Sequence, residues 1–270
     1  MILREKYINK IRPFYESDLI KIITGIRRCG KSVILNQVME EIKKISNNVI
    51  YLNFEDKLTL SRILLKYVED NRKKGKCYLF LDEVQEVKEW TKACKTLRLH
   101  DNSVFITGSN SKLLSKEFTK EFSGRYVSFR IRPFIYKEIL EYSKELKKEC
   151  NVIDYLIWGG FPKRVEFDGE AMRMYLNDLE DTIVINDLIN RYKIRKVDLF
   201  KSLVNFILQS NSRVISSKSI YEYLNNNFNN CSINTVIKYI GYLEEAYIIE
   251  KIKPYSTKKK SELKYYFKIY

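Results

Sequence analysis

The stretch Gly25-Ile26-Arg27-Arg28-Cys29-Gly30-Lys31-Ser32 decides how the first half of this 270-residue chain is organised. It reads G-x-x-x-x-G-K-S, a pattern typical of loops that bind the phosphates of a nucleotide. The glycines let the backbone curl, so that successive N–H groups point inward at an anion. We expect Lys31 to place a positive charge on the β- and γ-phosphates and Ser32 to offer its hydroxyl to Mg²⁺. The backbone of the whole stretch and of Val33 would complete the cradle.

The residues on both sides of this loop support that interpretation. Residues 19–24 are a short β-branched apolar run that predicts a strand, and residues 33–42 carry apolar side chains at helical spacing. The loop would therefore lie at a helix N-terminus, where the helix dipole also favours anions. The alternative is a chance match in a surface turn, which would need neither the strand nor the helix.

A second motif follows at residues 77–83, Cys-Tyr-Leu-Phe-Leu-Asp-Glu. A continuous apolar run is expected for a central parallel strand that is buried on both faces. Asp82 at its end can hold Mg²⁺, and Glu83 is placed to orient and deprotonate a water that attacks the γ-phosphate. The alternative is an acidic strand end that simply meets solvent.

Two further candidates follow later strands. After the strand predicted at 103–107, Ser109 or Asn110 would lie near the γ-phosphate, or would only cap a helix at 112–118. Arg125 precedes a strand at 126–131 and is either an arginine finger, acting in cis or across a subunit contact, or a surface arginine. Cys29 lies beside a helix N-terminus, an environment that lowers a thiol pKa.

Strands alternate with helices through residue 132, which predicts an α/β, doubly wound parallel sheet with its ligand at the carboxyl ends of the strands. We expect an ATPase-type core at 1–132, a helical lid region at 133–195 and a winged-helix domain at 196–270. In the last domain a short helix, a turn and a longer helix precede two strands with a basic tip, Lys258-Lys259-Lys260. The chain stops within the second of these strands, so we expect it to be a piece of a longer protein.

Composition limits the alternatives. The formal net charge is +15, which is either a nucleic-acid footprint or a general compositional bias toward lysine. Five cysteines without C-x-x-C spacing argue against disulfides and zinc clusters. No apolar run reaches the roughly 18 residues that span a bilayer, so we expect a soluble cytoplasmic protein with no membrane partner.

Several motifs together carry a resemblance to a known family: GIRRCGKS, YLNFED, YLFLDEVQ, ITGSNS, SGRY, PFIYKE, GGFP and the C-terminal winged-helix pattern. The chain resembles an AAA-family group of archaeal and bacterial ATPases, similar in layout to the signal-transduction ATPases with numerous domains. The resemblance implies that Gly25, Gly30, Lys31, Ser32 and Asp82 bind Mg²⁺-ATP, with Glu83 as base and Arg125 as finger. Relatives usually continue into a nuclease-like domain, and we expect residues 1–270 not to include it.

Two hypotheses from different classes remain. The first is an ATP-hydrolysing switch or motor, which Glu83 favours because a pure binder has no need of a base there. The second is a winged-helix DNA-binding regulator that uses ATP only as a ligand, which Lys258 to Lys260 favour. A small-molecule kinase fits poorly, because no acceptor-binding lid follows the loop. A homo-oligomer or a partner protein is compatible with either hypothesis.

Overall fold

The computed structural model describes residues 2–55, 61–108, 122–210, 214–228, 231–252 and 265–269. The chain forms two units, Met1–Val165 and Glu166–Tyr270, and each is considered by itself. The lid region expected at 133–195 contributes residues to both units. No helix of the described part combines the length and the apolar character needed to cross a bilayer.

A five-stranded parallel sheet forms the centre of the first unit, which confirms the predicted α/β class. Its strands are β1 (Ile20–Thr24), β2 (Val49–Asn53), β3 (Cys77–Asp82), β4 (Asn102–Thr107) and β5 (Tyr126–Arg130). They lie in the order β2-β3-β4-β1-β5. Strand β4 therefore separates the strand that enters the glycine-rich loop from the strand that ends in Asp82.

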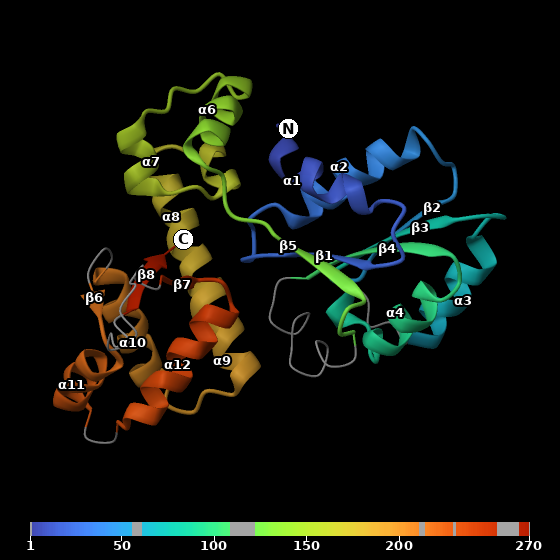
Figure 1. The fold of residues 1–270 in the computed structure, drawn as a ribbon. Coiled ribbons are helices and arrows are strands. Elements are labelled where there is room, and N and C mark those ends of the chain that lie inside the picture. Colours follow the sequence, from blue (N-terminus) through green and yellow to red (C-terminus); the bar gives the residue numbers. More distant parts are fainter. Residues whose placement is uncertain are drawn as a thin grey trace, which may run out of the picture. The chain divides into compact units, whose positions relative to one another are not determined.

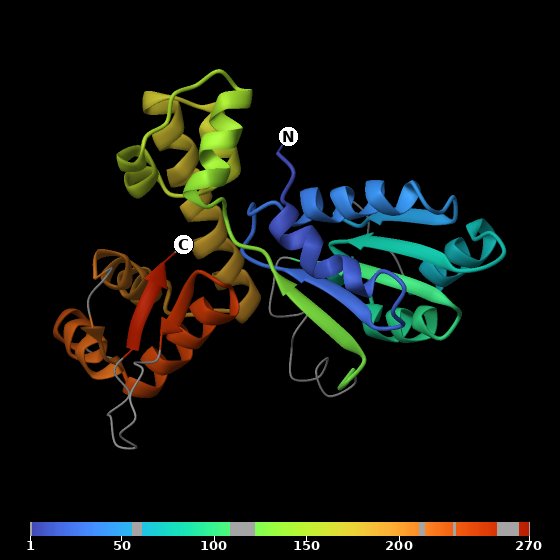
Figure 2. The same ribbon diagram turned by 45° about the horizontal axis from the view of Figure 1, so that its top comes forward.

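Helices cover both faces of this sheet (Figure 1, Figure 2). The helices α3 (Ser61–Asn71) and α4 (Trp90–Arg98) pack on one face, where they share a core with Ile20 and Ile22. The helices α1 (Glu5–Ile11) and α2 (Lys31–Lys43) cover the other face. Because successive strand residues point to opposite faces, each central strand must be apolar on both sides, which explains the continuous apolar runs.

A small helical layer completes the first unit. It contains α6 (Tyr136–Glu145) and α7 (Val152–Trp158), and its core joins Ile2, Phe134, Ile139 and Val165. Two of the motifs that carried the family resemblance meet here: the Phe134 N–H donates to the Gly160 carbonyl at 2.7 Å. A Cβ on Gly160 would lie 2.1 Å from the Phe134 oxygen, so only glycine fits. Larger elements are connected by short 3₁₀ helices, Arg12–Phe14, Val84–Glu86 and Pro162–Glu166.

The second unit begins with one long helical run. It comprises α8 (Gly169–Glu180), a π-helical segment (Asp181–Asn186) and α9 (Asp187–Tyr192), where the sequence predicts one helix at 172–191. The buried side chains Leu179, Ile183 and Leu188 follow at intervals of four and then five residues. The five-residue interval matches the wider π turn, so all three side chains stay on the buried face.

In the rest of the second unit, the described residues form three helices and a small antiparallel sheet. The helices are α10 (Val197–Gln209), α11 (Ser217–Asn227) and α12 (Ile233–Glu245), and the strands are β6 (Val214–Ile215), β7 (Ile249–Ile252) and β8 (Tyr265–Ile269). The strand order is β6-β8-β7. Ser216 and Ser232 cap α11 and α12 by accepting hydrogen bonds from backbone N–H groups. Lys258, Lys259 and Lys260 lie outside the described residues.

Candidate functional site

The glycine-rich loop joins the carboxyl end of β1 to the first residue of α2. Gly25 has a φ of 148°, and a Cβ there would lie 2.2 Å from the Ile131 carbonyl oxygen. Gly30 has a φ of 94° and immediately precedes Lys31, the first residue of α2. Both positions therefore require glycine, and the loop ends at the N-terminus of a 13-residue helix, where free N–H groups attract anions.

Lys31 folds back into this loop. Its side chain is buried, and Nζ donates to the Ile26 carbonyl oxygen at 3.3 Å. An ammonium group held by one carbonyl has two further protons to donate, so Lys31 is able to turn toward an incoming phosphate without a large rearrangement.

Asp82 is buried at the end of β3 and is surrounded by hydroxyl groups. Its Oδ1 accepts from Ser32 Oγ at 3.2 Å and from the Thr107 hydroxyl. Its Oδ2 accepts from the Tyr51 hydroxyl at 3.2 Å. Burial, the Asp82 charge and this hydrogen bond raise the pKa of Tyr51 to about 12, so the phenol remains a donor at neutral pH. The structure thus brings together the predicted pair of Ser32 and Asp82.

This pair fits a magnesium ion. Mg²⁺ prefers oxygen ligands and usually takes only one or two from the protein, with water and phosphate supplying the others. A hydroxyl and a carboxylate 3.2 Å apart at the end of the glycine-rich loop match that donor set. Among the described residues, no group of three or more His, Cys, Asp or Glu side chains could form a metal site without such help.

Glu83 directly follows this cluster with an unusual backbone. Its φ of 52° and ψ of 44° place a non-glycine residue in the left-handed region. Its N–H donates to Thr107 Oγ1 at 3.0 Å, and its carboxylate accepts from Gln85 Nε2 at 2.5 Å. The local strain and these two contacts fix Glu83 next to Asp82, and such strain gathers at functional sites.

Arg125 lies at the opposite end of the sheet. Its carbonyl accepts from the N–H of Ile20, the first residue of β1, whereas the glycine-rich loop follows the last residue of that strand. Strand β5 has five residues, so about 16 Å of strand separates Arg125 from the loop end of the sheet. Arg125 therefore lies far from the glycine-rich loop of its own chain, so a finger across a subunit contact and a surface arginine are the alternatives that this position allows. Ser109 and Asn110 lie outside the described residues.

The expectation of a lowered thiol pKa at Cys29 is wrong. Its side chain is fully buried, and Sγ donates to the Ile131 carbonyl at 3.5 Å. Burial raises the pKa of Cys29, and the charges of Lys31 and Arg4 only reduce that effect. Desolvation of the thiolate therefore outweighs the nearby helix N-terminus.

Sequence reasoning did not single out Thr107, Tyr51 or Gln85. Thr107 and Tyr51 each lie on a strand that the sequence predicts, but only the strand order places both beside Asp82. Gln85 lies in the motif that the sequence does identify, two residues after Glu83, and its contact with that residue is local. No local sequence pattern marks Arg4 as part of the site.

The fold and the site define a nucleotide-binding domain of the P-loop class, and known proteins agree. A family described as an AAA domain matches residues 17–140, and a domain of unknown function matches residues 150–270. An uncharacterized protein of Haemophilus influenzae is 32% identical over 281 residues, covering 98% of this chain and 70% of that protein. The chain belongs to the AAA-domain family of P-loop proteins.

Two further similarities agree with this assignment. An uncharacterized protein of Methanocaldococcus jannaschii is 32% identical over 259 residues, covering 90% of this chain and 58% of that protein. The solved structure of a Walker-type ATPase of Pyrococcus abyssi is 15% identical, with a TM-score of 0.67, over 100% of this chain and 93% of that one. At this identity the similarity concerns the fold alone.

Proposed function

We propose that this protein binds Mg²⁺-ATP at the glycine-rich loop and hydrolyses it, acting as a nucleotide-driven switch or motor. One observation carries the proposal: Ser32 Oγ lies 3.2 Å from Asp82 Oδ1 at the start of α2, beside the buried Lys31. Few functions other than holding a metal-bound phosphate need a lysine, a hydroxyl and a carboxylate at the end of such a loop.

The residues divide the work of binding. The N–H groups of residues 25–33 would face the phosphates, and Lys31 would exchange the Ile26 carbonyl for a phosphate oxygen. Ser32 and Asp82 would hold Mg²⁺, which neutralises the negative charge of the phosphates when bound. The Thr107 and Tyr51 hydroxyls would keep the Asp82 carboxylate oriented while Ser32 turns to the metal.

Glu83 would act as the general base for the attacking water. Its carboxylate already accepts one hydrogen bond, from Gln85, and has capacity to accept the proton of a water. A positioned base contributes about 10²–10⁴ to the rate. In this proposal Asn110 would lie near the γ-phosphate, and Arg125 would act as a finger from a neighbouring subunit, which makes the active form an oligomer.

Thermal unfolding with and without nucleotide tests binding. A ligand at 100 times its Kd stabilises by about 2.7 kcal/mol, which for this chain size is roughly 5–10 °C. Lys31→Ala should remove the shift, whereas Lys43→Ala, a surface change in the same helix, should keep it. An equal shift in wild type and Lys31→Ala would exclude the loop as the binding site.

Hydrolysis is tested separately. Glu83→Gln should keep the Mg²⁺-ATP shift and lose turnover, while Glu86→Gln, an exposed acid in the same turn, should lose neither. Turnover of Glu83→Gln at the wild-type rate would show that Glu83 is not the base and would favour a protein that uses ATP only as a ligand.

A DNA-binding regulator is the second candidate, and one observation favours it. The second unit has the element order of a winged helix, with α10, β6, α11, α12, β7 and β8 in sequence. Of the residues on α12 suited to reading bases, Tyr242 is already stacked on Tyr192 of α9, with ring centroids 3.6 Å apart. Asn234 and Lys238 remain exposed on that helix.

Salt dependence decides whether DNA is a partner. If Lys258, Lys259 and Lys260 contact phosphates, replacing all three with alanine should lower the log–log salt slope by up to about 2.7. An unchanged slope would mean that DNA binds to other parts of the surface. If DNA does not bind even at low salt, the net charge of +15 reflects general amino-acid usage and not a nucleic-acid partner.

A further inference from the structure

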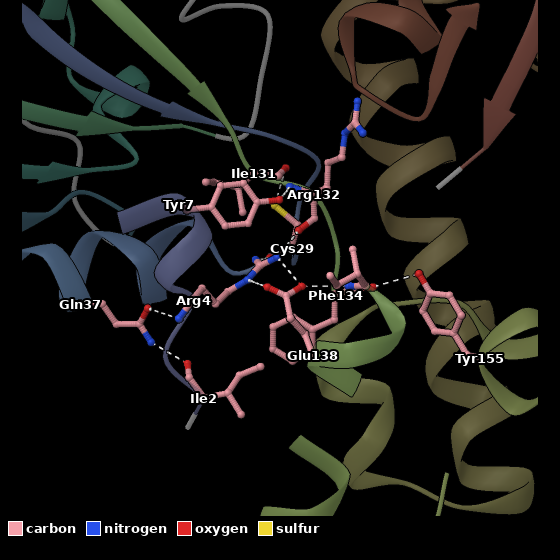
Figure 3. A network of polar contacts seen from close by, with 11 residues as sticks. Ile2, Arg4, Tyr7, Cys29, Gln37, Ile131, Arg132, Phe134, Glu138 and Tyr155 are labelled. Atoms are coloured by element: carbon pink, nitrogen blue, oxygen red, sulfur yellow. Dashed lines mark hydrogen bonds and ion pairs between the residues drawn. The ribbon is translucent and has the colours of Figure 1, made fainter. Parts of the chain in front are cut away.

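Arg4 is a buried arginine that reaches the back of the glycine-rich loop from the N-terminal segment (Figure 3). Its residue is 2% exposed. Its Nη1 donates to the Cys29 carbonyl oxygen at 3.1 Å, and its Nη2 donates to the Arg132 carbonyl at 3.0 Å. Burying a charged guanidinium is unfavourable, and two neutral carbonyl acceptors offset only part of this desolvation. The other contacts of Arg4 must therefore offset the rest.

Glu138 provides this compensation. Its two carboxylate oxygens accept from Arg4 Nε at 2.8 Å and from Nη2 at 3.0 Å, a bidentate pair across 134 residues. The same carboxylate accepts from the N–H of Ile135 at 2.9 Å and so caps α6. The guanidinium carbon also lies over the rings of Tyr7 and Phe134, 4.6 and 5.0 Å from their centroids. A bidentate fork on a carboxylate, with the same group over two aromatic rings, is a geometry that lysine cannot reproduce.

The segment that carries Arg4 is itself fixed to α2. Gln37 accepts from the Arg4 N–H at 3.2 Å and donates to the Ile2 carbonyl at 2.7 Å. On the other side, the Tyr7 hydroxyl accepts from the N–H of Arg132 at 3.1 Å. The guanidinium is thus held on all sides, so the position of the Cys29 carbonyl is held with it.

The contact with Cys29 has a consequence for the phosphates. The Cys29 carbonyl and the Gly30 N–H belong to one planar peptide, and in a trans peptide they point in opposite directions. A donor that holds the carbonyl outward therefore turns the Gly30 N–H inward, to the side where successive loop N–H groups would meet an anion. Gly30, with a φ of 94°, would otherwise be free to rotate this peptide.

We propose that Arg4, held in place by Glu138, is a positioning residue for polyphosphate binding: it presets the Cys29–Gly30 peptide so that the Gly30 N–H faces the phosphates. This inference rests on the proposed nucleotide site and specifies how that site is kept ready. It also gives the PFIYKE motif a role, because Phe134 and Glu138 supply an aromatic ring and the carboxylate.

Affinities for three probes test the inference: Mg²⁺-ATP, Mg²⁺-tripolyphosphate, which has no base, and adenosine, which has no phosphate. Losing one hydrogen bond to a charged phosphate should weaken binding about ten-fold or more. Arg4→Met should therefore weaken ATP and tripolyphosphate by similar factors and leave adenosine unchanged. Arg4→Lys, which keeps the charge but loses the fork, should show the same pattern to a smaller extent.

Two further variants separate positioning from folding. Glu138→Gln should weaken the same two probes, and the Arg4→Met/Glu138→Gln double variant should be no weaker than Arg4→Met, because both act through one contact. The matched control is Arg12→Met, since Arg12 forms a similar bidentate pair with Glu41 at the surface. Arg12→Met should leave all three affinities unchanged.

Three results would overturn the inference. Equal losses for ATP and adenosine, with tripolyphosphate unchanged, would mean that Arg4 contacts the base. If all Arg4 and Glu138 variants have lower unfolding midpoints but unchanged affinities for the probes, the role of Arg4 is structural only. If Arg4→Met does not fold, the affinities of Arg4→Lys and Glu138→Gln decide between positioning and a structural role. A wild-type protein without Lys31-dependent binding of either phosphate probe would refute the proposed function itself.

Discussion

Replacing Lys21 by methionine should remove a pH dependence from the stability of the first unit. Lys21 is the second residue of β1 and is completely buried. Its Nζ donates to the Ser17 carbonyl at 2.9 Å and to Ser103 Oγ at 2.7 Å, and it lies 4.7 Å from the centroid of the Phe105 ring. None of these partners carries a charge, so the protonated amine is poorly compensated.

The sign and size of the effect follow from this environment. Burial and, to a smaller extent, the charge of Lys76 lower the pKa of Lys21 to about 7 from its ordinary 10.5, although Asp18 and Glu16 oppose the shift. Between those two pKa values the unfolded chain binds more protons than the folded one, so the free energy of unfolding rises with pH. At 1.36 kcal/mol per pKa unit, the rise between pH 7 and 8.5 is about 1.5 kcal/mol.

The buried cysteines set the upper limit of the pH range in which the effect of Lys21 can be measured. Burial raises the pKa of Cys77 to about 11 and that of Cys94 to about 12. Thiols of the unfolded chain ionise at about pH 8.5, and above that pH they bind fewer protons than the buried thiols. Their contribution therefore lowers the free energy of unfolding as pH rises, in the opposite sense to that of Lys21.

Urea unfolding at four pH values from 7.0 to 8.5 measures the slope. Both tryptophans of the chain, Trp90 and Trp158, lie in the first unit, so their fluorescence reports on that unit. The wild type should gain stability with pH, and Lys21→Met should lose most of that gain. Lys43→Met, at the surface of α2, controls for the change in net charge. Parallel slopes for wild type and Lys21→Met would refute the reasoning.

Three other substitutions or modifications have expected outcomes. In the folded protein Cys29 should be alkylated far more slowly than the partly exposed Cys150, because it is buried; equal rates by peptide mass mapping would contradict the structure. Gly160→Ala should lower the thermal midpoint, since its Cβ would meet backbone at 2.1 Å, whereas Gly241→Ala, in open space within α12, should not. Tyr51→Phe should lower the free energy of unfolding by about 1 kcal/mol, because the buried carboxylate loses a donor; an unchanged urea midpoint would count against that hydrogen bond.

Local periodicity was enough to predict most of the first unit. Residues 19–24, 77–83 and 103–107 read as strands because their apolar runs are short and rich in β-branched or aromatic side chains, and all three form strands in the structure. Helix α7, in contrast, was not predicted. Val152, Ile153, Leu156 and Ile157 are all exposed on it, so its apolar residues do not mark a buried face within the unit.

Long-range contacts account for what the sequence did not reveal. The loop motif suggests an activated thiol at Cys29, but Ile131, 102 residues away, closes over it. The Arg4–Glu138 pair spans 134 residues and has no local pattern. Likewise, Tyr242 stacks on Tyr192 of another helix, and no local pattern indicates that pairing. In each case the deciding partner comes from a distant element, which a single sequence does not identify.

The π-helical segment between α8 and α9 bears on how this chain tolerates change in length. Its turn holds one residue more than an α-turn, which is why Ile183 and Leu188 are five residues apart and both buried. Such a turn is what remains when a helix absorbs a single inserted residue without turning its far end away from the core. Deleting one residue there should leave a plain α-helix in which these two buried positions are four residues apart and still on one face, whereas keeping the extra residue in plain α geometry would rotate α9 by about 100° about its axis. Relatives that are one residue shorter at this point should therefore have a plain α-helix with the apolar pattern of α9 kept in register.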